Sequence, residues 1–208
     1  METVGVLLFG DRRVPRRLTG LPVHAGDVDA AIGAYRRLVV VGGDADLAAV
    51  LTGLLRAGRL DVEVAYAPRR RTPATRAYRL PAGRRAARRA PRGTARRVPL
   101  IRDETGSVIA GRAGWRPPGD GKLLHGEAVV DDTPLFDGDV AGVRVEPTLA
   151  MPGLRASARN RLWPRWISGR AVQLGSTGVV VVRDGVAGPR PARRSTFYRH
   201  VEGWLLVR

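Results

Sequence analysis

The chain has 208 residues, a formal net charge of +17, a hydrophobic content of 44% and no cysteine. This length can hold one domain or two small ones, and the hydrophobic content is typical of a folded chain. The absence of cysteine excludes disulfides, zinc–thiolate sites and thiol nucleophiles. No apolar stretch approaches the roughly 20 residues that span a bilayer, and Arg12 and Arg13 follow the first apolar run too closely for a secretory signal. A cytoplasmic protein is therefore expected.

The positive charge comes almost wholly from arginine, because Lys122 is the only lysine. A net charge of this size creates a field that attracts polyanions such as nucleic acid, acidic lipid surfaces or nucleotide phosphates. The net charge therefore predicts an anionic partner, but it does not distinguish nucleic acid, lipid and nucleotide from one another.

The first 80 residues alternate between short apolar runs and helical apolar patterns. Strands are expected at 4–9, 38–41 and 62–66, and helices at 28–37, where Asp27 is the expected N-cap, and at 46–56. The intervening residues 11–26 are expected to form a loop. Strands that alternate with helices favour a small parallel α/β domain, which we place at residues 1–80.

A Gly42-Gly43-Asp44 turn separates the second of these strands from the following helix. A helix start offers unpaired backbone N–H groups and the positive end of the helix dipole, which suit a phosphate group. Plain loop chemistry explains such a turn equally well. Asp46, just inside the helix, either holds a metal or repels a nucleotide, or it simply caps the helix.

Residues 81–97 are expected to form a basic linker. Twelve arginines and no acidic residue lie between Arg69 and Arg97, and four prolines interrupt any long helix. Within this stretch, residues 84–89 are expected to form one or two basic helical turns. The candidate anion-binding residues are Arg69, Arg70, Arg71, Arg84, Arg85, Arg88 and Arg89.

Residues 98–208 have the pattern of an antiparallel β domain, either a sandwich or a barrel, made of six to eight short strands. Turn residues at 103–106, Asp137-Gly138 and Asp184-Gly185 stand at positions typical of hairpins. Residues 151–166 are expected to be irregular. The fold class is therefore α/β plus all-β, with a small parallel α/β nucleotide-binding-like domain followed by an antiparallel β-sandwich domain.

The order of a strand, a Gly-Gly-Asp turn, a helix and then an all-β half resembles the diacylglycerol kinase superfamily of lipid kinases, whose architecture NAD kinases share. The segment Val39-Val-Val-Gly-Gly-Asp44 is similar to the family's Gly-Gly-Asp-Gly-Thr motif, with Ala45 and Asp46 in place of its last two residues. The segment 179–185 also resembles a late strand of the family's β domain, and the segment 135–140 resembles one of its hairpins. The resemblance implies ATP with Mg²⁺ as cofactors, and it places Gly42, Gly43, Asp44 and Asp46 at the nucleotide.

Other family features are missing from the chain. Residues 68–75 read Pro-Arg-Arg-Arg-Thr-Pro-Ala-Thr where the family has a glycine-rich phosphate loop, and the acidic segment that supplies the catalytic base is not found. No catalytic residue is assigned for this reason. No metal site is expected either, because His24, His125 and His200 are isolated in the sequence.

Three functions remain open at this stage. The chain is a divergent lipid kinase that moves the ATP γ-phosphate to a lipid hydroxyl, an inactive kinase-fold module that docks on anionic lipid at the inner face of the membrane, or a basic nucleic-acid-binding protein. Whether it is an enzyme is not decided by the sequence. The low aromatic content of 5% counts against nucleic acid.

Overall fold

The computed structural model describes residues 2–159 and 164–208, which fall into two compact units. The α/β unit comprises residues 1–98 and 202–208, and the β unit comprises residues 99–201. No helix among the described residues combines the length and the hydropathy that a membrane crossing needs.

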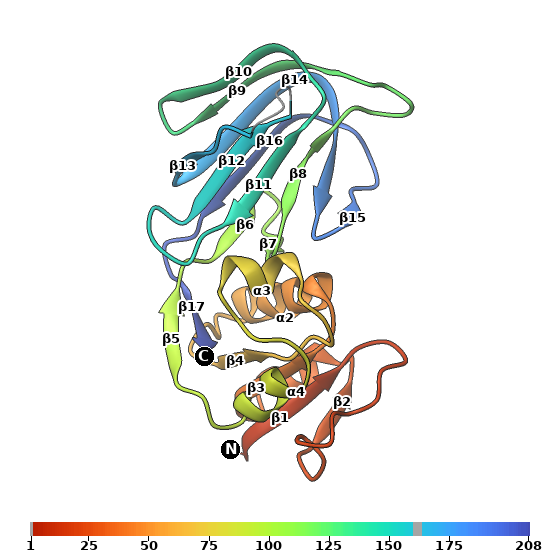
Figure 1. Cartoon of the computed structure of the whole chain (residues 1–208), viewed down its shortest axis with the longest axis vertical. Coiled ribbons are helices and arrows are strands. Elements are labelled where there is room, and N and C mark those ends of the chain that lie inside the picture. The colour runs from red at the N-terminus through yellow and green to blue at the C-terminus, as the bar shows by residue number, and fades with distance from the viewer. Residues whose placement is uncertain (1, 160–163) are drawn as a thin grey trace. The chain divides into compact units, whose positions relative to one another are not determined.

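The α/β unit is built on a six-stranded sheet with the order β2-β1-β3-β4-β17-β5 (Figure 1). Neighbouring strands are parallel except for β5, which runs antiparallel to β17. The strands are β1 (Glu2–Leu8), β2 (Val23–Ala25), β3 (Tyr35–Val41), β4 (Glu63–Tyr66), β5 (Ala95–Val98) and β17 (Trp204–Val207). The helices are α1 (Val28–Ile32), α2 (Asp44–Arg56), α3 (Pro73–Ala77) and α4 (Gly83–Arg89).

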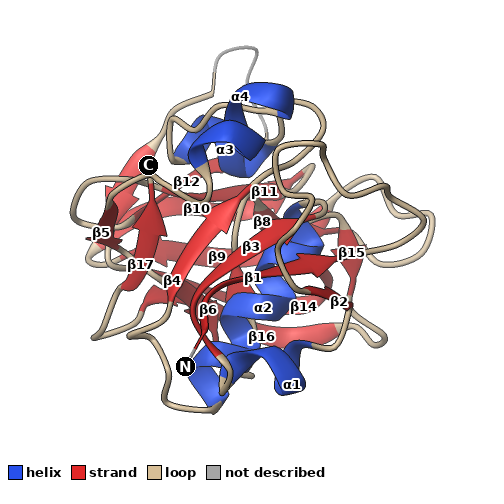
Figure 2. Cartoon of the chain, turned by 90° about the horizontal axis from the view of Figure 1, so that it is seen from below, coloured by secondary structure: helices blue, strands red, loops and turns tan. Residues whose placement is uncertain are grey.

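Helices cover both faces of this sheet (Figure 2). On one face, Val6, Val39 and Ala65 of the central strands pack against Ala86 and Ala87 of α4. On the other face, α1 and α2 contact β3, and α2 buries the apolar stripe that its helical periodicity predicts, Leu47, Val50, Leu51 and Leu54. Asp27 caps α1, as expected, by accepting a hydrogen bond from the Ala30 amide at 3.0 Å.

Several expectations for the first half of the chain were wrong. Residues 81–97 are not a linker, because α4 buries Ala86 and Ala87 against the sheet and β5 pairs with the last strand. That last strand, β17, belongs to the α/β unit and not to the β domain, since it runs parallel to β4. The helix expected at 28–37 ends at Ile32 because β3 begins at Tyr35, and the loop at 11–26 contains β2.

The β unit contains eleven hydrogen-bonded strands among the described residues. They are β6 (Ile101–Asp103), β7 (Val108–Ile109), β8 (Ala113–Arg116), β9 (Leu124–Val130), β10 (Thr133–Val140), β11 (Val143–Pro147), β12 (Leu154–Ala158), β13 (Ile167–Gly169), β14 (Ala171–Arg183), β15 (Val186–Ala187) and β16 (Ala192–Arg199). The first half of β14 pairs with β9 and β16, and its second half pairs with β8 and β15. The long strand β14 therefore joins the two layers of an antiparallel sandwich, whose core includes the stacked rings of Trp115 and Phe197.

Turn residues locate two of the three expected hairpins in this unit. Residues 103–106 connect β6 to β7, and Asp184-Gly185 connects β14 to β15 with positive φ at both residues. Asp137-Gly138 is not a turn, since it lies inside β10, where Gly138 has a φ of 99° in a continuous pairing with β9. The segment 151–166 was expected to be irregular, but its described residues 151–159 contain β12, and residues 160–163 lie outside the described residues.

Candidate phosphate-binding site

The glycine turn, defined by Gly42, Gly43 and Asp44, lies between the end of β3 and the start of α2. Gly43 is the N-cap residue of α2, and its amide donates a hydrogen bond of 2.7 Å to Oδ2 of Asp46. The Gly43 amide, at a turn that the sequence predicted to bind a phosphate group, therefore donates its hydrogen bond to a carboxylate of the protein itself.

The same carboxylate explains why position 42 is glycine. A Cβ atom on Gly42 would lie 2.6 Å from Oδ2 of Asp46, a distance that side chains cannot tolerate. Asp46 thus folds back over the turn, and Arg12 lies beside it with Nη1 3.5 Å from the same oxygen. Glycine at position 42 therefore leaves space for the carboxylate of Asp46.

Asp44 has a structural environment. Its side chain is buried, its Oδ1 accepts a hydrogen bond of 2.9 Å from the Tyr66 hydroxyl, and its Oδ2 accepts one of 3.0 Å from the Ala74 amide. These bonds tie the first turn of α2 to the end of β4 and to the first turn of α3. Both oxygens of Asp44 are consequently engaged within the α/β unit.

Replacing Asp44 by alanine is expected to lower the free energy of unfolding by about 2–4 kcal/mol, because two buried hydrogen bonds lose their acceptor. Urea unfolding followed by circular dichroism measures the change. Asp29→Ala is the control, since Asp29 is exposed in the first turn of α1. If Asp44→Ala proves as stable as the control while nucleotide binding is lost, Asp44 is a ligand-binding residue and not a structural one.

A pocket of about 1130 Å³ lies near the carboxyl ends of β3 and β4 in the α/β unit. Val41 and Ala67, from the ends of these strands, line it together with the loop that follows β1 and the exposed side of α4. Eight arginines surround it, Arg12, Arg13, Arg16, Arg17, Arg69, Arg84, Arg85 and Arg88. We refer to this site as the arginine pocket.

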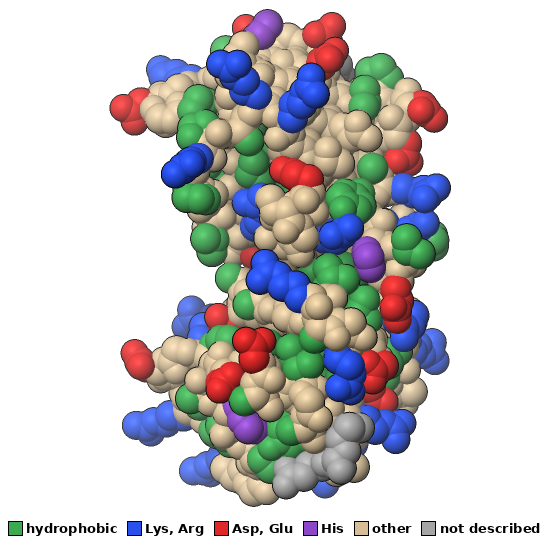
Figure 3. Space-filling view, turned by 180° about the vertical axis from the view of Figure 1, so that it is seen from behind, with side chains coloured by type: hydrophobic (Ala, Val, Ile, Leu, Met, Phe, Trp, Pro, Cys, Tyr) green, Lys and Arg blue, Asp and Glu red, His purple; other side chains and the backbone are tan. Residues whose placement is uncertain are grey.

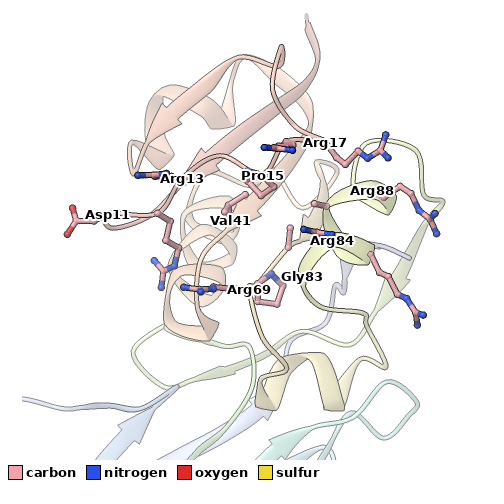
Figure 4. Close-up of a pocket in the computed structure, with 15 residues that line it drawn as sticks. Asp11, Arg13, Pro15, Arg17, Val41, Arg69, Gly83, Arg84 and Arg88 are labelled. Atoms are coloured by element: carbon pink, nitrogen blue, oxygen red, sulfur yellow. The ribbon is translucent and has the colours of Figure 1, made fainter.

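Three segments of the chain supply these arginines (Figure 4). Arg13 and Arg17 come from the loop after β1, Arg69 follows β4, and Arg84 and Arg88 belong to α4. The strand order reverses at β1, because β2 lies on one side of it and β3 on the other. In open α/β sheets, ligands bind in crevices at the carboxyl ends of strands near such a reversal.

The charge of the arginine pocket is largely uncompensated. Of the eight arginines that line the pocket, only Arg12 forms an ion pair with a described residue, and Asp11 is the only acidic residue in the lining. The side chains of the other seven arginines are exposed, and they make no hydrogen bond or ion pair within the described parts of the chain. The pocket is therefore a concentrated source of positive potential.

The charge of the chain is also concentrated in the unit that carries this pocket. The α/β unit contains 21 arginines and nine acidic residues, a net charge of +12 out of +17. On the face of this unit that Figure 3 presents, acidic side chains are mixed with basic ones. The lining of the arginine pocket, with eight arginines and a single aspartate, is more one-sided.

Arg37 holds α4 in place beside the pocket. Its Nε donates a hydrogen bond of 2.6 Å to Oε2 of Glu63, and its Nη1 donates to the carbonyl oxygens of Ala90 at 3.2 Å and Pro91 at 2.8 Å. These bonds connect β3 and β4 to the carboxyl end of α4. The helix that carries three of the pocket's eight arginines is therefore anchored from inside the unit.

The structure brings together four of the arginines selected from the sequence, namely Arg69, Arg84, Arg85 and Arg88. Arg70 and Arg71 do not line the pocket, Arg89 lines a neighbouring groove, and the glycine turn with Asp46 lies outside the lining. Sequence reasoning missed Arg12, Arg13, Arg16 and Arg17. The signal that marks them is two arginine pairs directly after the first strand of a parallel sheet.

The segments of the β unit that resemble the lipid-kinase family have structural roles. Asp184 accepts hydrogen bonds from the amides of Ala110, Gly111 and Arg112 at 2.6–2.8 Å. Residues 135–140 form part of the continuous strand β10. Both oxygens of Asp184 are thus engaged by backbone amides, so this carboxylate serves the hairpin.

Magnesium does not fit the described residues of the glycine turn. Both Asp44 oxygens accept hydrogen bonds from the protein, and Oδ2 of Asp46 accepts from Gly43 and lies beside Arg12. No group of three acidic or histidine side chains within the described residues is placed to hold a metal ion. Of the four carboxylate oxygens of Asp44 and Asp46, only Oδ1 of Asp46 makes no hydrogen bond within the described residues, so the turn offers Mg²⁺ a single free carboxylate oxygen.

Comparison with known proteins gives a fold but no close relative. No protein-family model matches the sequence, and no curated protein matches it. Among solved structures, a diacylglycerol kinase from Bacillus anthracis str. Sterne has 12% sequence identity and a TM-score of 0.71, with 99% of this chain and 96% of that chain covered. An NAD kinase from Archaeoglobus fulgidus in complex with ATP has 12% identity and a TM-score of 0.65, with 99% and 94% covered.

A yeast NADH kinase complexed with NADH is similar over 99% of this chain and 83% of that chain, with 10% identity and a TM-score of 0.62. These likenesses span both units of the chain. They confirm the α/β plus β-sandwich class and the resemblance to lipid and NAD kinases at the level of the fold. The chain has the fold that diacylglycerol kinases and NAD kinases share.

Proposed function

We propose that this chain is a nucleotide-binding module of kinase fold in which the arginine pocket, and not the glycine turn, takes the phosphate groups. The observation that carries the proposal is the set of seven exposed arginines without an ion-pair partner around one pocket. Arginine binds phosphate oxygens through two parallel N–H donors, so an arginine-lined pocket suits a phosphate chain. Structural neighbours in complex with ATP and with NADH support a nucleotide as the ligand class.

The hydrogen bonds of the glycine turn argue against phosphoryl transfer at that turn. A phosphate oxygen that approached the Gly43 amide would have to displace the Asp46 carboxylate, which carries charge of the same sign. Asp44 is occupied by Tyr66 and Ala74. A kinase needs bridging metal ions and a base that accepts the proton of the attacking hydroxyl, and neither is provided by the residues of the turn.

Phosphoryl transfer from ATP to a lipid hydroxyl is the second candidate. Its support is the near-full coverage of the Bacillus anthracis diacylglycerol kinase structure by this chain. On this proposal the protein acts in the cytoplasm at the inner face of the membrane, and ATP is a substrate. The two candidates agree on nucleotide binding and differ in whether the nucleotide is consumed.

Nucleotide binding is tested by thermal unfolding and calorimetry with ATP, ADP, pyrophosphate and adenosine. ATP and pyrophosphate are expected to raise the melting temperature and adenosine is not, because the pocket recognises phosphate groups. Ligand at about 100 times its Kd adds about 2.7 kcal/mol, which corresponds to roughly 5–10 °C for a chain of this size. An equal shift with adenosine, or none with millimolar ATP, would refute the assignment of the pocket.

Catalysis is tested separately by following ADP release from ATP in mixed micelles that contain diacylglycerol. The binding-module proposal predicts no release above that of micelles without protein. Release that depends on diacylglycerol would establish the lipid-kinase candidate instead. Including Mg²⁺ and Mn²⁺ in turn ensures that a negative result does not reflect the wrong metal ion.

A further inference from the structure

Helix α4 carries basic surface on two sides. Besides the arginine pocket, a second groove of about 560 Å³ is lined by Pro81, Arg85, Arg88, Arg89, Arg92 and Gly93. Arg85 and Arg88 line both the arginine pocket and this second groove. The positively charged surface is therefore continuous from the loop after β1, over α4, to the residues that follow it.

The spacing of arginines on α4 makes the free helix electrostatically unfavourable. Arg84 and Arg88, and likewise Arg85 and Arg89, are four residues apart, and like charges at this spacing repel each other on a helix. No acidic residue occurs between positions 64 and 98 to balance them. A bound polyanion would relieve this repulsion along the whole helix, whereas one small ligand in the arginine pocket would relieve it on one side.

The number of arginines exceeds what one nucleotide can neutralise. Ten different arginines line the pocket and the groove together, with Asp11 as the single acidic residue. A single nucleoside triphosphate has too few negative charges to neutralise all ten of these arginines. A ligand that contacts both sides must present a regular series of phosphate groups, as a nucleic acid backbone does with one charge per nucleotide.

The residues that line the pocket and the groove also favour a nucleic acid backbone over a membrane surface as the partner. Peripheral membrane helices insert Trp, Phe or Leu side chains into the lipid, but no large exposed hydrophobic residue lines the pocket or the groove. The absence of aromatic lining residues gives the site no platform for stacking bases. These features favour contacts to phosphates without reading of the base sequence.

We infer that the arginine pocket and the second groove bind the phosphodiester backbone of a nucleic acid that crosses α4. The inference rests on the proposed phosphate-binding role of the arginine pocket, and it extends that role from a mononucleotide to a polymer. Because binding depends on phosphate contacts, the affinity falls steeply as the salt concentration rises and depends little on base sequence.

The decisive variant is Arg89→Ala/Arg92→Ala, because these two arginines line only the second groove. Its matched control is Arg193→Ala/Arg194→Ala, which removes the same charge from exposed positions in the β unit. Fluorescence anisotropy with a short labelled single strand and the corresponding duplex is measured between about 50 and 200 mM salt. ATP affinity is measured on the same proteins, and circular dichroism confirms that they are folded.

The groove variant is expected to bind oligonucleotide at least about tenfold more weakly than the control. The slope of log K against log salt should fall by about 1.8 for the duplex and about 1.4 for the single strand, since each phosphate contact contributes about 0.9 and about 0.7 respectively. Its ATP affinity is expected to match that of the control. A tighter complex with the duplex or with the single strand identifies which form of nucleic acid supplies the backbone.

Other results overturn the inference in distinguishable ways. The inference of a polymer ligand is wrong if ATP binds and oligonucleotides bind no more tightly than ATP. It is also wrong if the groove variant binds oligonucleotide as the control does. In both cases the proposed mononucleotide site is unaffected. If neither ATP nor pyrophosphate binds, the proposed function itself fails. If the protein ignores oligonucleotides but sediments with phosphatidylglycerol vesicles, and the groove variant does not, the partner of α4 is a lipid surface.

Discussion

Replacing Arg84 and Arg88 together by alanine is expected to weaken ATP binding about 100-fold and, at low salt, to raise the melting temperature of the free protein. The loss of binding follows from two charge-assisted hydrogen bonds of about 1.5 kcal/mol each, and each 1.4 kcal/mol is about tenfold in affinity. The gain in stability follows because a repelling pair four residues apart disappears, worth about 0.2–0.5 kcal/mol. Both side chains are exposed and make no hydrogen bond or ion pair with the described residues, so their removal breaks no such interaction.

Calorimetry with ATP and thermal unfolding without ligand measure these opposite effects on one variant. Arg193→Ala/Arg194→Ala again serves as the control, because it changes the net charge equally and leaves the pocket intact. A variant that loses both stability and binding would show that the arginines support the fold of α4. In that case the positive charge of the pocket would not be evidence for a ligand.

Replacing Arg37 by leucine is expected to lower the free energy of unfolding by about 3 kcal/mol. The side chains of Arg37 and Glu63 are only 12% and 15% exposed, and removing one partner leaves the other charge largely buried. Breaking such a pair costs about 3–5 kcal/mol when burial is complete, so the partial exposure places this pair at the lower end. The carbonyl oxygens of Ala90 and Pro91 also lose their donor.

Arg36→Leu provides a matched control for this prediction, because its side chain is 71% exposed and lies 3.9 Å from the same glutamate. It is expected to change the stability by less than about 1 kcal/mol, the usual value of a surface ion pair. The double variant Arg37→Leu/Glu63→Leu should recover part of the loss, since no buried charge remains. Urea unfolding gives all three values, and equal effects of Arg36→Leu and Arg37→Leu would refute the buried-anchor interpretation.

Arg37→Leu should also weaken ATP binding under conditions where the protein remains folded, although Arg37 does not line the arginine pocket. The expected cause is greater freedom of α4, whose carboxyl end Arg37 holds through Ala90 and Pro91. Arg37 is thus a positioning residue for the pocket. Unchanged affinity in the folded variant would show that Ala86 and Ala87 are sufficient to fix the helix.

Local patterns in the sequence were enough to define much of the fold. The apolar run of β3, the helical stripe of α2 and the N-cap at Asp27 depend on neighbouring residues, so their periodicity and capping could be read directly. The Asp184-Gly185 turn is similar, because its positive φ values are set by residue type. The segment at 137–138 misled because the same dipeptide also fits inside the strand β10.

The role of the glycine turn illustrates a limit of motif reasoning. The backbone N–H groups of this turn were expected to suit a phosphate group, but the group that lies against Gly42 and bonds the Gly43 amide is the Asp46 carboxylate. A glycine motif indicates that there is space beside the backbone, but it does not identify the group that occupies this space. The ligand-like partner could be recognised only once the side chain of Asp46 was placed.

The α/β and β halves, their central strands and helices, and the excess of positive charge could be predicted from the amino-acid sequence, because each follows from composition or from contacts close along the chain. The three-dimensional structure was needed to show that residues 81–97 cover the sheet, that β17 pairs with β4, and that arginines from a loop, a strand end and α4 surround one pocket. Those features depend on pairings between segments far apart in the chain. Such pairings are set by which apolar faces meet in three dimensions, and no local pattern encodes them.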